Sequence, residues 1–114
     1  MKITKEMESA LDRVREAMIV KYGLFMRGDE EHIVEMREEF AAGILHDIGN
    51  KYIKITKGGS VHSFIVNIEN DKKFAYGDIL KAASWNSPAR NKARGNIFNE
   101  SDIETRLCWT GVNY

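Results

Sequence analysis

Through the first 50 residues, apolar and charged positions alternate with the period of an amphipathic helix. Apolar residues recur every three or four positions, so they share one helix face. In the first predicted helix this stripe consists of Ile3, Met7, Ala10, Leu11, Val14, Ala17 and Met18. Gly23 is the expected end of that helix, because glycine freely adopts the left-handed conformation of a cap. A second helix is predicted from Asp29 to Gly49-Asn50, and its stripe consists of Ile33, Met36, Phe40, Ile44 and Ile48.

From residue 51 the apolar period changes to two, which indicates strands. Strands are predicted at 51–57 and 61–68, joined by a tight turn at Gly58-Gly59-Ser60. A third strand is predicted over 74–80 with a bend at Gly77-Asp78, and a last one over 106–114. The sequence therefore predicts an α+β fold with a single domain over 1–114. In it, a helical hairpin (1–50) packs on a small antiparallel sheet in a β-rich part (51–114).

A short basic helix is predicted within the second half. Ser87 suits the cap, and Pro88 suits the first helical position, where its missing N–H has no partner to lose. The helix would continue to Arg94 and end at Gly95. The run that starts at Ser101, S-D-I-E, has the spacing of a capping box and predicts one further helical turn before the last strand.

Composition places the chain among proteins of a reducing compartment. It has 114 residues, and no apolar run approaches the ~20 residues of a membrane span, so we expect no membrane association. The only cysteine, Cys108, cannot form an internal disulfide, and the acidic N-terminal residues do not resemble a secretory signal. We therefore predict a cytoplasmic protein.

The zero net charge hides an asymmetry between the two halves. Residues 1–50 carry eleven acidic and seven basic residues, a net −4, whereas residues 51–114 carry six acidic and ten basic residues, a net +4. Such a field orients an approaching anion. It is too weak for a protein that coats nucleic acid along its length, which is usually strongly basic.

The segment 84–98 is the main candidate binding site, because it holds three cationic residues and no acidic one. Arg90 and Arg94 lie four residues apart and would share a helix face, where guanidinium groups can bind phosphate. An adjacent tryptophan could stack on a base. The predicted site for nucleic acid or a nucleotide phosphate consists of Lys81, Trp85, Arg90, Lys92 and Arg94. The alternative is structural: Arg94 would complement the helix dipole, Arg90 would pair with an acidic helix, and Trp85 would belong to the core.

No motif for catalysis or metal binding is present. His32 lies among glutamates, but the spacing of a zinc site is missing, so we predict no metal ion, no cofactor and no catalytic residue. His62 shares a predicted strand face with Phe64 and Val66, which favours a hydrogen-bonded, partly buried side chain. A hydrolase of a phosphorylated ligand, with His62 as general base and Arg90 on the phosphate, is an alternative.

Parts of the second half resemble a known group of proteins. The runs K-Y-I-K-I-T-K, S-V-H-S-F-I-V, Y-G-D-I-L-K-A-A-S-W-N-S-P-A and A-R-G-N-I-F, within about residues 51–98, are similar to a segment of small uncharacterised proteins encoded by tailed bacteriophages. This resemblance implies an accessory protein of the host cytoplasm and implies no activity.

A second functional hypothesis concerns a host protein as the partner. The connection after the first helix is unusually apolar, and large exposed apolar residues often mark partner surfaces. The predicted partner-binding residues are Leu24, Phe25 and Met26. The stripe of Met7, Leu11, Val14 and Met18 could pack within one chain or between two copies, so the sequence leaves the oligomeric state open.

Overall fold

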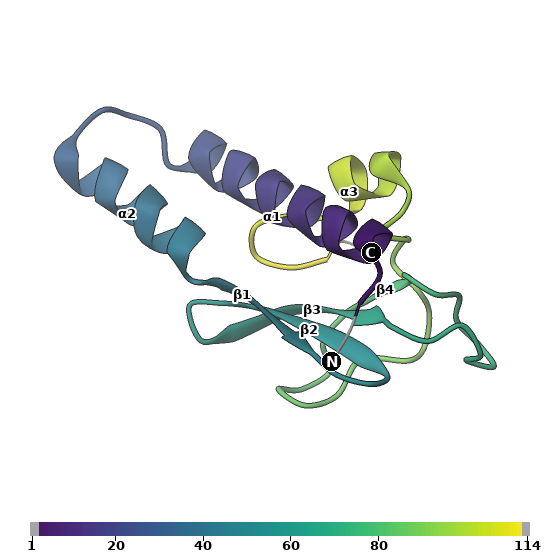
Figure 1. The fold of residues 1–114 in the computed structure, drawn as a ribbon. Coiled ribbons are helices and arrows are strands. Elements are labelled where there is room, and N and C mark those ends of the chain that lie inside the picture. Colours follow the sequence, from purple (N-terminus) through teal and green to yellow (C-terminus); the bar gives the residue numbers. More distant parts are fainter. Residues whose placement is uncertain (1–2, 113–114) are drawn as a thin grey trace.

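Three helices and a four-stranded antiparallel sheet make up the computed structural model, which describes residues 3–112 (Figure 1). The helices are α1 (Lys5–Phe25), α2 (Glu31–Ala42) and α3 (Glu100–Arg106). The strands are β1 (Ile44–Ile48), β2 (Tyr52–Lys57), β3 (Ser60–Val66) and β4 (Ile79–Leu80). The predicted α+β class is confirmed.

The sheet is a meander with the strand order β1-β2-β3-β4. β2 and β3 form the predicted hairpin, in which Val66 lies opposite Tyr52 and Ser60 lies opposite Lys57. Gly58 and Gly59 close it with φ angles of +50° and +83°. Glycine is favoured at both positions, because this tight turn needs the left-handed region twice.

The main core lies between α1 and one face of the sheet. The α1 stripe is buried at Met7, Ala10, Leu11, Val14 and Met18. It packs on alternate strand residues, which are Ile53, Ile55, Ile65 and Ile79. Since each of these side chains is at most 2% exposed, this stripe packs within one chain.

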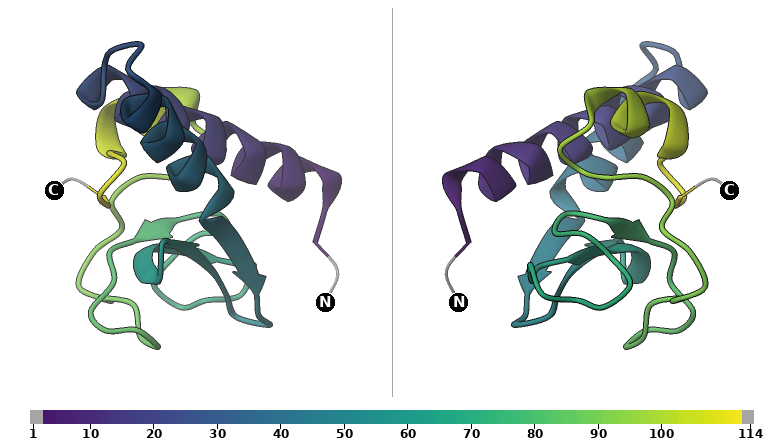
Figure 2. Two further views of the ribbon diagram at one scale, coloured as in Figure 1. Left: turned by 90° about the vertical axis from the view of Figure 1, so that its left-hand side faces the viewer. Right: turned by 90° about the vertical axis from the view of Figure 1, so that its right-hand side faces the viewer.

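A smaller core lies on the opposite face of the sheet. Phe64 and Leu80 are cross-strand partners that neighbour Ile65 and Ile79 in sequence, so they point away from α1. They pack with Val66 and Phe74. The long segment between β3 and α3 covers this face, whereas all three described helices lie on the other side (Figure 2).

The helix boundaries differ from those predicted. α1 continues past Gly23 to Phe25, and α2 ends at Ala42 with Gly43 as its cap. Ile44 and Ile48, which were assigned to the second helix, instead belong to strand β1. β1 pairs with β2 from Ile44 opposite Lys57 to Ile48 opposite Ile53. The sheet therefore begins inside the segment predicted to be a helical hairpin.

Two predictions for the second half are also wrong. The third strand is limited to β4, although the bend at Gly77 is present with φ +87°. No helix forms over 88–94, since Pro88 bridges to Ala82 and the backbone N–H of Arg94 donates to the carbonyl of Ile79. These hydrogen bonds to residues of β4 and the chain just after it replace the hydrogen bonds of a helix, which would be too short to be stable alone.

The chain end departs from prediction as well. The helical turn near Ser101 exists as α3, but its cap is Asn99, whose side chain accepts from the backbone N–H groups of Ser101 and Asp102. Instead of a last strand in the sheet, the chain turns back on itself and pairs Leu107 with Val112. The final two residues of that predicted strand, 113–114, lie outside the described residues.

Candidate nucleic-acid interface

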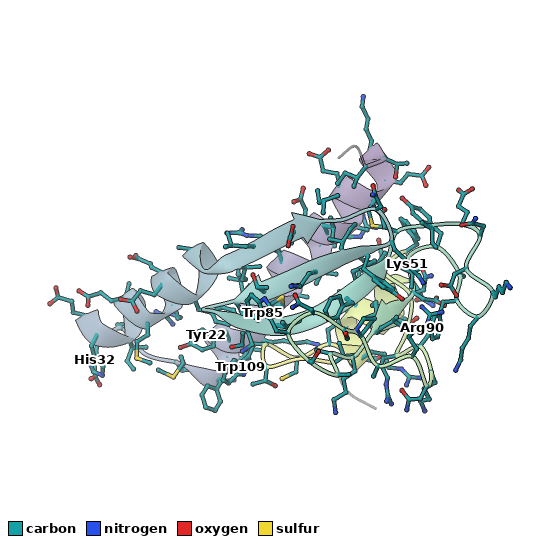
Figure 3. The ribbon with its side chains drawn as sticks, turned by 90° about the horizontal axis from the view of Figure 1, so that it is seen from below. Tyr22, His32, Lys51, Trp85, Arg90 and Trp109 are labelled. Atoms are coloured by element: carbon teal, nitrogen blue, oxygen red, sulfur yellow. The ribbon has the colours of Figure 1, made fainter. Side chains whose placement is uncertain are left out.

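Trp85 lies over the face of the sheet that is turned away from α1 (Figure 3). It belongs to a loop whose ends are joined by hydrogen bonds from Ala83 and Ser84 to the carbonyl of Ser87. The residue is 52% exposed, so it is not a core residue. Lys54 of β2 holds its ammonium 4.6 Å from the centre of the indole and donates to Asn86 over 3.2 Å. The indole is thus anchored by a cation and still open to solvent.

Lys54 is the residue beside Trp85 that sequence reasoning overlooked. It alternates with the buried residues Ile53 and Ile55, which already indicates that its side chain leaves the sheet on the other face. Its neighbour on β3 is Phe64, so the lysine stem runs across an apolar surface before it reaches Trp85. The contact itself joins residues 31 positions apart and could not be read from the sequence.

Arg90 does not extend freely outward, as the binding prediction required. Its guanidinium donates to both carboxylate oxygens of Asp71 at 3.0 Å, donates to the Tyr52 hydroxyl, and stacks 4.9 Å from the centre of the Phe74 ring. The Asp71 side chain is only 3% exposed. The hydrogen bond from Arg90, and then those from the backbone N–H groups of Lys73 and Phe74, hold the pKa of Asp71 well below its usual range. Asp71 likewise raises the pKa of Arg90.

Arg94 is removed from the surface, since the residue is 3% exposed. The expected pair of outward arginines on one helix face is therefore wrong for both members. Lys92 is exposed, whereas Lys81 is half-buried and lines a cavity of about 290 Å³ with His62 and Thr110. The five predicted site residues consequently do not form one cluster, and Trp85 is the member best placed to meet a ligand.

Three polar side chains within residues 75–102, those of Asp78, Asn96 and Asp102, form one hydrogen-bond network. Asp78 accepts hydrogen bonds from the Ala75 N–H and from the Asn96 side chain, at 2.9 and 3.0 Å. The Asn96 backbone N–H donates in turn to Asp102 of α3 over 2.9 Å. These bonds join three parts of the structure: the bend at Gly77, the segment around Asn96 that runs beside β4, and helix α3. Asp78 and Asn96 are therefore structural residues.

The segment that contains Trp85 and the strands before it carries a net positive charge. Residues 51–94 carry nine basic and three acidic residues, a net +6. Asp71 is bound to Arg90, and Asp78 accepts the bonds described above, so Glu69 is the acid of this segment that lies exposed. Lys51, Lys72, Lys73 and Lys92 are exposed as well. Lys51 and Arg90 lie toward the same end of the sheet in Figure 3.

His62 and His32 are poorly placed for catalysis or metal binding. His62 is 2% exposed, its Nε2 donates to the carbonyl of Cys108 over 2.7 Å, and its Nδ1 accepts from Ser63 over 2.9 Å. Burial lowers its pKa to about 4. Because both ring nitrogens are bonded to the protein itself, the hydrolase hypothesis lacks its general base. His32 is exposed beside Glu30, and within residues 3–112 no group of three His, Cys, Asp or Glu side chains is arranged to hold a metal ion.

The predicted partner segment is not a loop. Leu24 and Phe25 form the last turn of α1, where they are 58% and 66% exposed, and Met26 is its half-buried cap. Phe25 lies 5.1 Å from Trp109, whose ring also meets Tyr22 at 5.0 Å. Tyr22 and Trp109 are neighbours near one end of the sheet in Figure 3. Leu24, one residue earlier, points about 100° away from Phe25 around the helix axis.

Comparison with known proteins gives a family and no activity. Residues 2–114 match a family of unknown function, DUF7717. The chain belongs to this family. No curated protein and no solved structure matches the chain. Because the description of DUF7717 states no function, the phage resemblance of residues 51–98 stays a prediction.

Among the helices of residues 3–112, none combines the length and apolar character required to cross a membrane.

Proposed function

We propose that the protein binds single-stranded nucleic acid, without catalysing a reaction, through the sheet face around Trp85 and Lys54. The observation that carries this proposal is an indole, 52% exposed and contacted by a lysine, inside a segment of net charge +6. A base stacks on the aromatic ring, and lysines neutralise the phosphates on either side. The resemblance of residues 51–98 to tailed-phage proteins supports a place in the host cytoplasm and does not bear on the ligand.

Single strands are favoured over duplexes because stacking requires an unpaired base. In a duplex the bases are covered by their neighbours, so only the phosphate contacts would remain. A mononucleotide offers one base and no extended phosphate chain, so we expect it to bind more weakly than an oligonucleotide. Stacking on the exposed indole is worth ~1–3 kcal/mol, which corresponds to about 5- to 150-fold in affinity.

The experiment is a fluorescence-anisotropy titration of labelled DNA and RNA oligonucleotides of about 12 nucleotides, single- and double-stranded, at ~25 and ~150 mM salt. Trp85→Ala should weaken single-strand binding at least fivefold. Lys54→Gln should reduce the slope of log affinity against log salt by about one, because one phosphate contact is lost.

Two variants remove the same side-chain types elsewhere. Phe25→Ala deletes an exposed aromatic ring at the end of α1, and Lys5→Gln deletes a lysine at its start. Both should bind like wild type. The proposal is overturned if no oligonucleotide binds at low salt, or if Trp85→Ala binds as tightly as Phe25→Ala.

A further inference from the structure

α1 carries a second apolar stripe, which the core does not use. Val20 and Leu24 lie one helical turn apart and are 53% and 58% exposed. Val20 follows the fully buried Met18 by two residues, about 200° around the axis, so it faces away from the sheet. An apolar stripe opposite the core is unexplained by the fold of one chain.

The stripe borders a groove between α1 and α3 with a volume of about 450 Å³. Its apolar lining residues are Ala17, Val20 and Ile103. Leu24 extends the stripe by one turn beyond Val20. From Arg13, where the groove begins, to Leu24 the helix rises ~16 Å, the length of about three helical turns.

The rim of the groove is predominantly acidic. Three glutamates line it: Glu16, Glu100 and Glu104. Of the two basic lining residues, Lys21 directs its ammonium to backbone carbonyls at the end of α3, including that of Glu104 at 2.7 Å. The Lys21 ammonium therefore caps the C-terminal end of α3 and does not point into the groove. Arg13 is then outnumbered by three carboxylates.

We propose that this groove docks an amphipathic helix of a partner protein, one that carries Lys or Arg on both sides of an apolar stripe. Helices bind in such grooves through apolar residues one turn apart, and the acidic rim selects basic flanks. A second copy of this chain is disfavoured as the occupant, because two copies meeting at this groove would oppose their own glutamates. The proposal is independent of the nucleic-acid interface, which lies on the other side of the sheet.

The test uses two model peptides of about 14 residues, which share a leucine stripe at helical spacing and carry either Lys or Glu on its flanks. Binding to the full chain is measured by isothermal titration, and the site is located from amide NMR shifts. The Lys peptide should bind at least about tenfold more tightly than the Glu peptide, with the largest shifts at Ala17, Val20 and Ile103. Replacing Val20 and Leu24 together by serine should weaken the Lys peptide about tenfold or more.

Phe25→Ser is the matched control, because it removes an apolar residue of the same helix end that is at least as exposed, packs on Trp109 and does not line the groove. It should leave the peptide affinity unchanged. Glu16→Gln with Glu104→Gln should reduce the preference for the Lys peptide while preserving the fold. Equal affinities of the two peptides, shifts confined to other surfaces, or a dimer in solution that the Val20/Leu24 double variant dissociates would each overturn the proposal.

Discussion

At the scale of single residues, His62 gives the protein a specific dependence on pH. In the folded chain, burial lowers the pKa of His62 from 6.5 to about 4. Between pH 6.5 and pH 4, His62 is protonated in the unfolded chain and neutral in the folded chain, so acid favours unfolding. The contribution is fully present above pH 6.5 and is lost as the pH falls toward 4, which amounts to about 3 kcal/mol in free energy of unfolding.

Urea denaturation from pH 7.5 to pH 4, the lower limit set by that pKa of about 4, measures this effect. His62→Gln preserves a donor for the Cys108 carbonyl but does not titrate, so it should destabilise the protein at neutral pH and less so in acid. The other ionisable side chains are the same in both proteins, so their effects cancel in the difference; this includes His46, whose pKa is lowered mainly by burial. A stability difference that stays constant across this range would contradict the assignment.

At the scale of elements, the Gly77 bend should control the pairing of β4 with the chain at 94–97. The carbonyl of Gly77 accepts from Ile97 over 2.8 Å, and a Cβ on Gly77 would lie 2.5 Å from the Phe98 ring. Gly59 has a similar φ of +83°, but a Cβ there meets nothing within 4 Å. Gly59→Ala should therefore cost ~1 kcal/mol of backbone strain, and Gly77→Ala at least ~1 kcal/mol more, because Phe98 must move.

Thermal and urea unfolding of the two glycine variants provide the comparison. The additional loss of stability in Gly77→Ala should come with faster hydrogen exchange at the amides of Ile79 and Ile97. These amides donate the hydrogen bonds that pair β4 with the segment 94–97. Equal destabilisation of both variants would mean that the bend tolerates a side chain and that the contact with Phe98 has little effect.

Helices and strands with an uninterrupted hydrophobic period could be predicted from the sequence. Segments whose conformation depends on contacts with distant residues could not. α1 and the β2–β3 hairpin follow from uninterrupted periods and from a two-glycine turn. Ile44 and Ile48 were misassigned because a spacing of four places residues on one face of a strand as well as on one face of a helix. The segment after β4 contains helix-forming signals, but pairing with Ile79 outweighs them. Lys54 meets Trp85, and Asp71 meets Arg90, only once the chain has folded.

At the scale of the whole molecule, the two proposed surfaces lie on opposite sides of a two-layer structure. The groove lies on the α1–α3 side, and Trp85 lies beyond the sheet, so a helix and a sheet layer separate them (Figures 1 and 3). Each layer is about 10 Å thick. Substitutions that far apart, with no shared contacts, usually act independently.

The two surfaces also differ in charge, which should keep their ligands apart. The three glutamates that line the groove repel a phosphate chain, whereas residues 51–94, at +6, attract it, so a bound strand should leave the groove clear. We therefore expect the Val20→Ser/Leu24→Ser variant to bind oligonucleotides like wild type, and Trp85→Ala to bind the Lys peptide like wild type. The two titrations are run separately, because a basic peptide would bind the oligonucleotide itself. A change of more than about twofold in either cross-measurement would show that the surfaces are coupled through α1 and the sheet, since independent sites differ by at most ~0.5 kcal/mol.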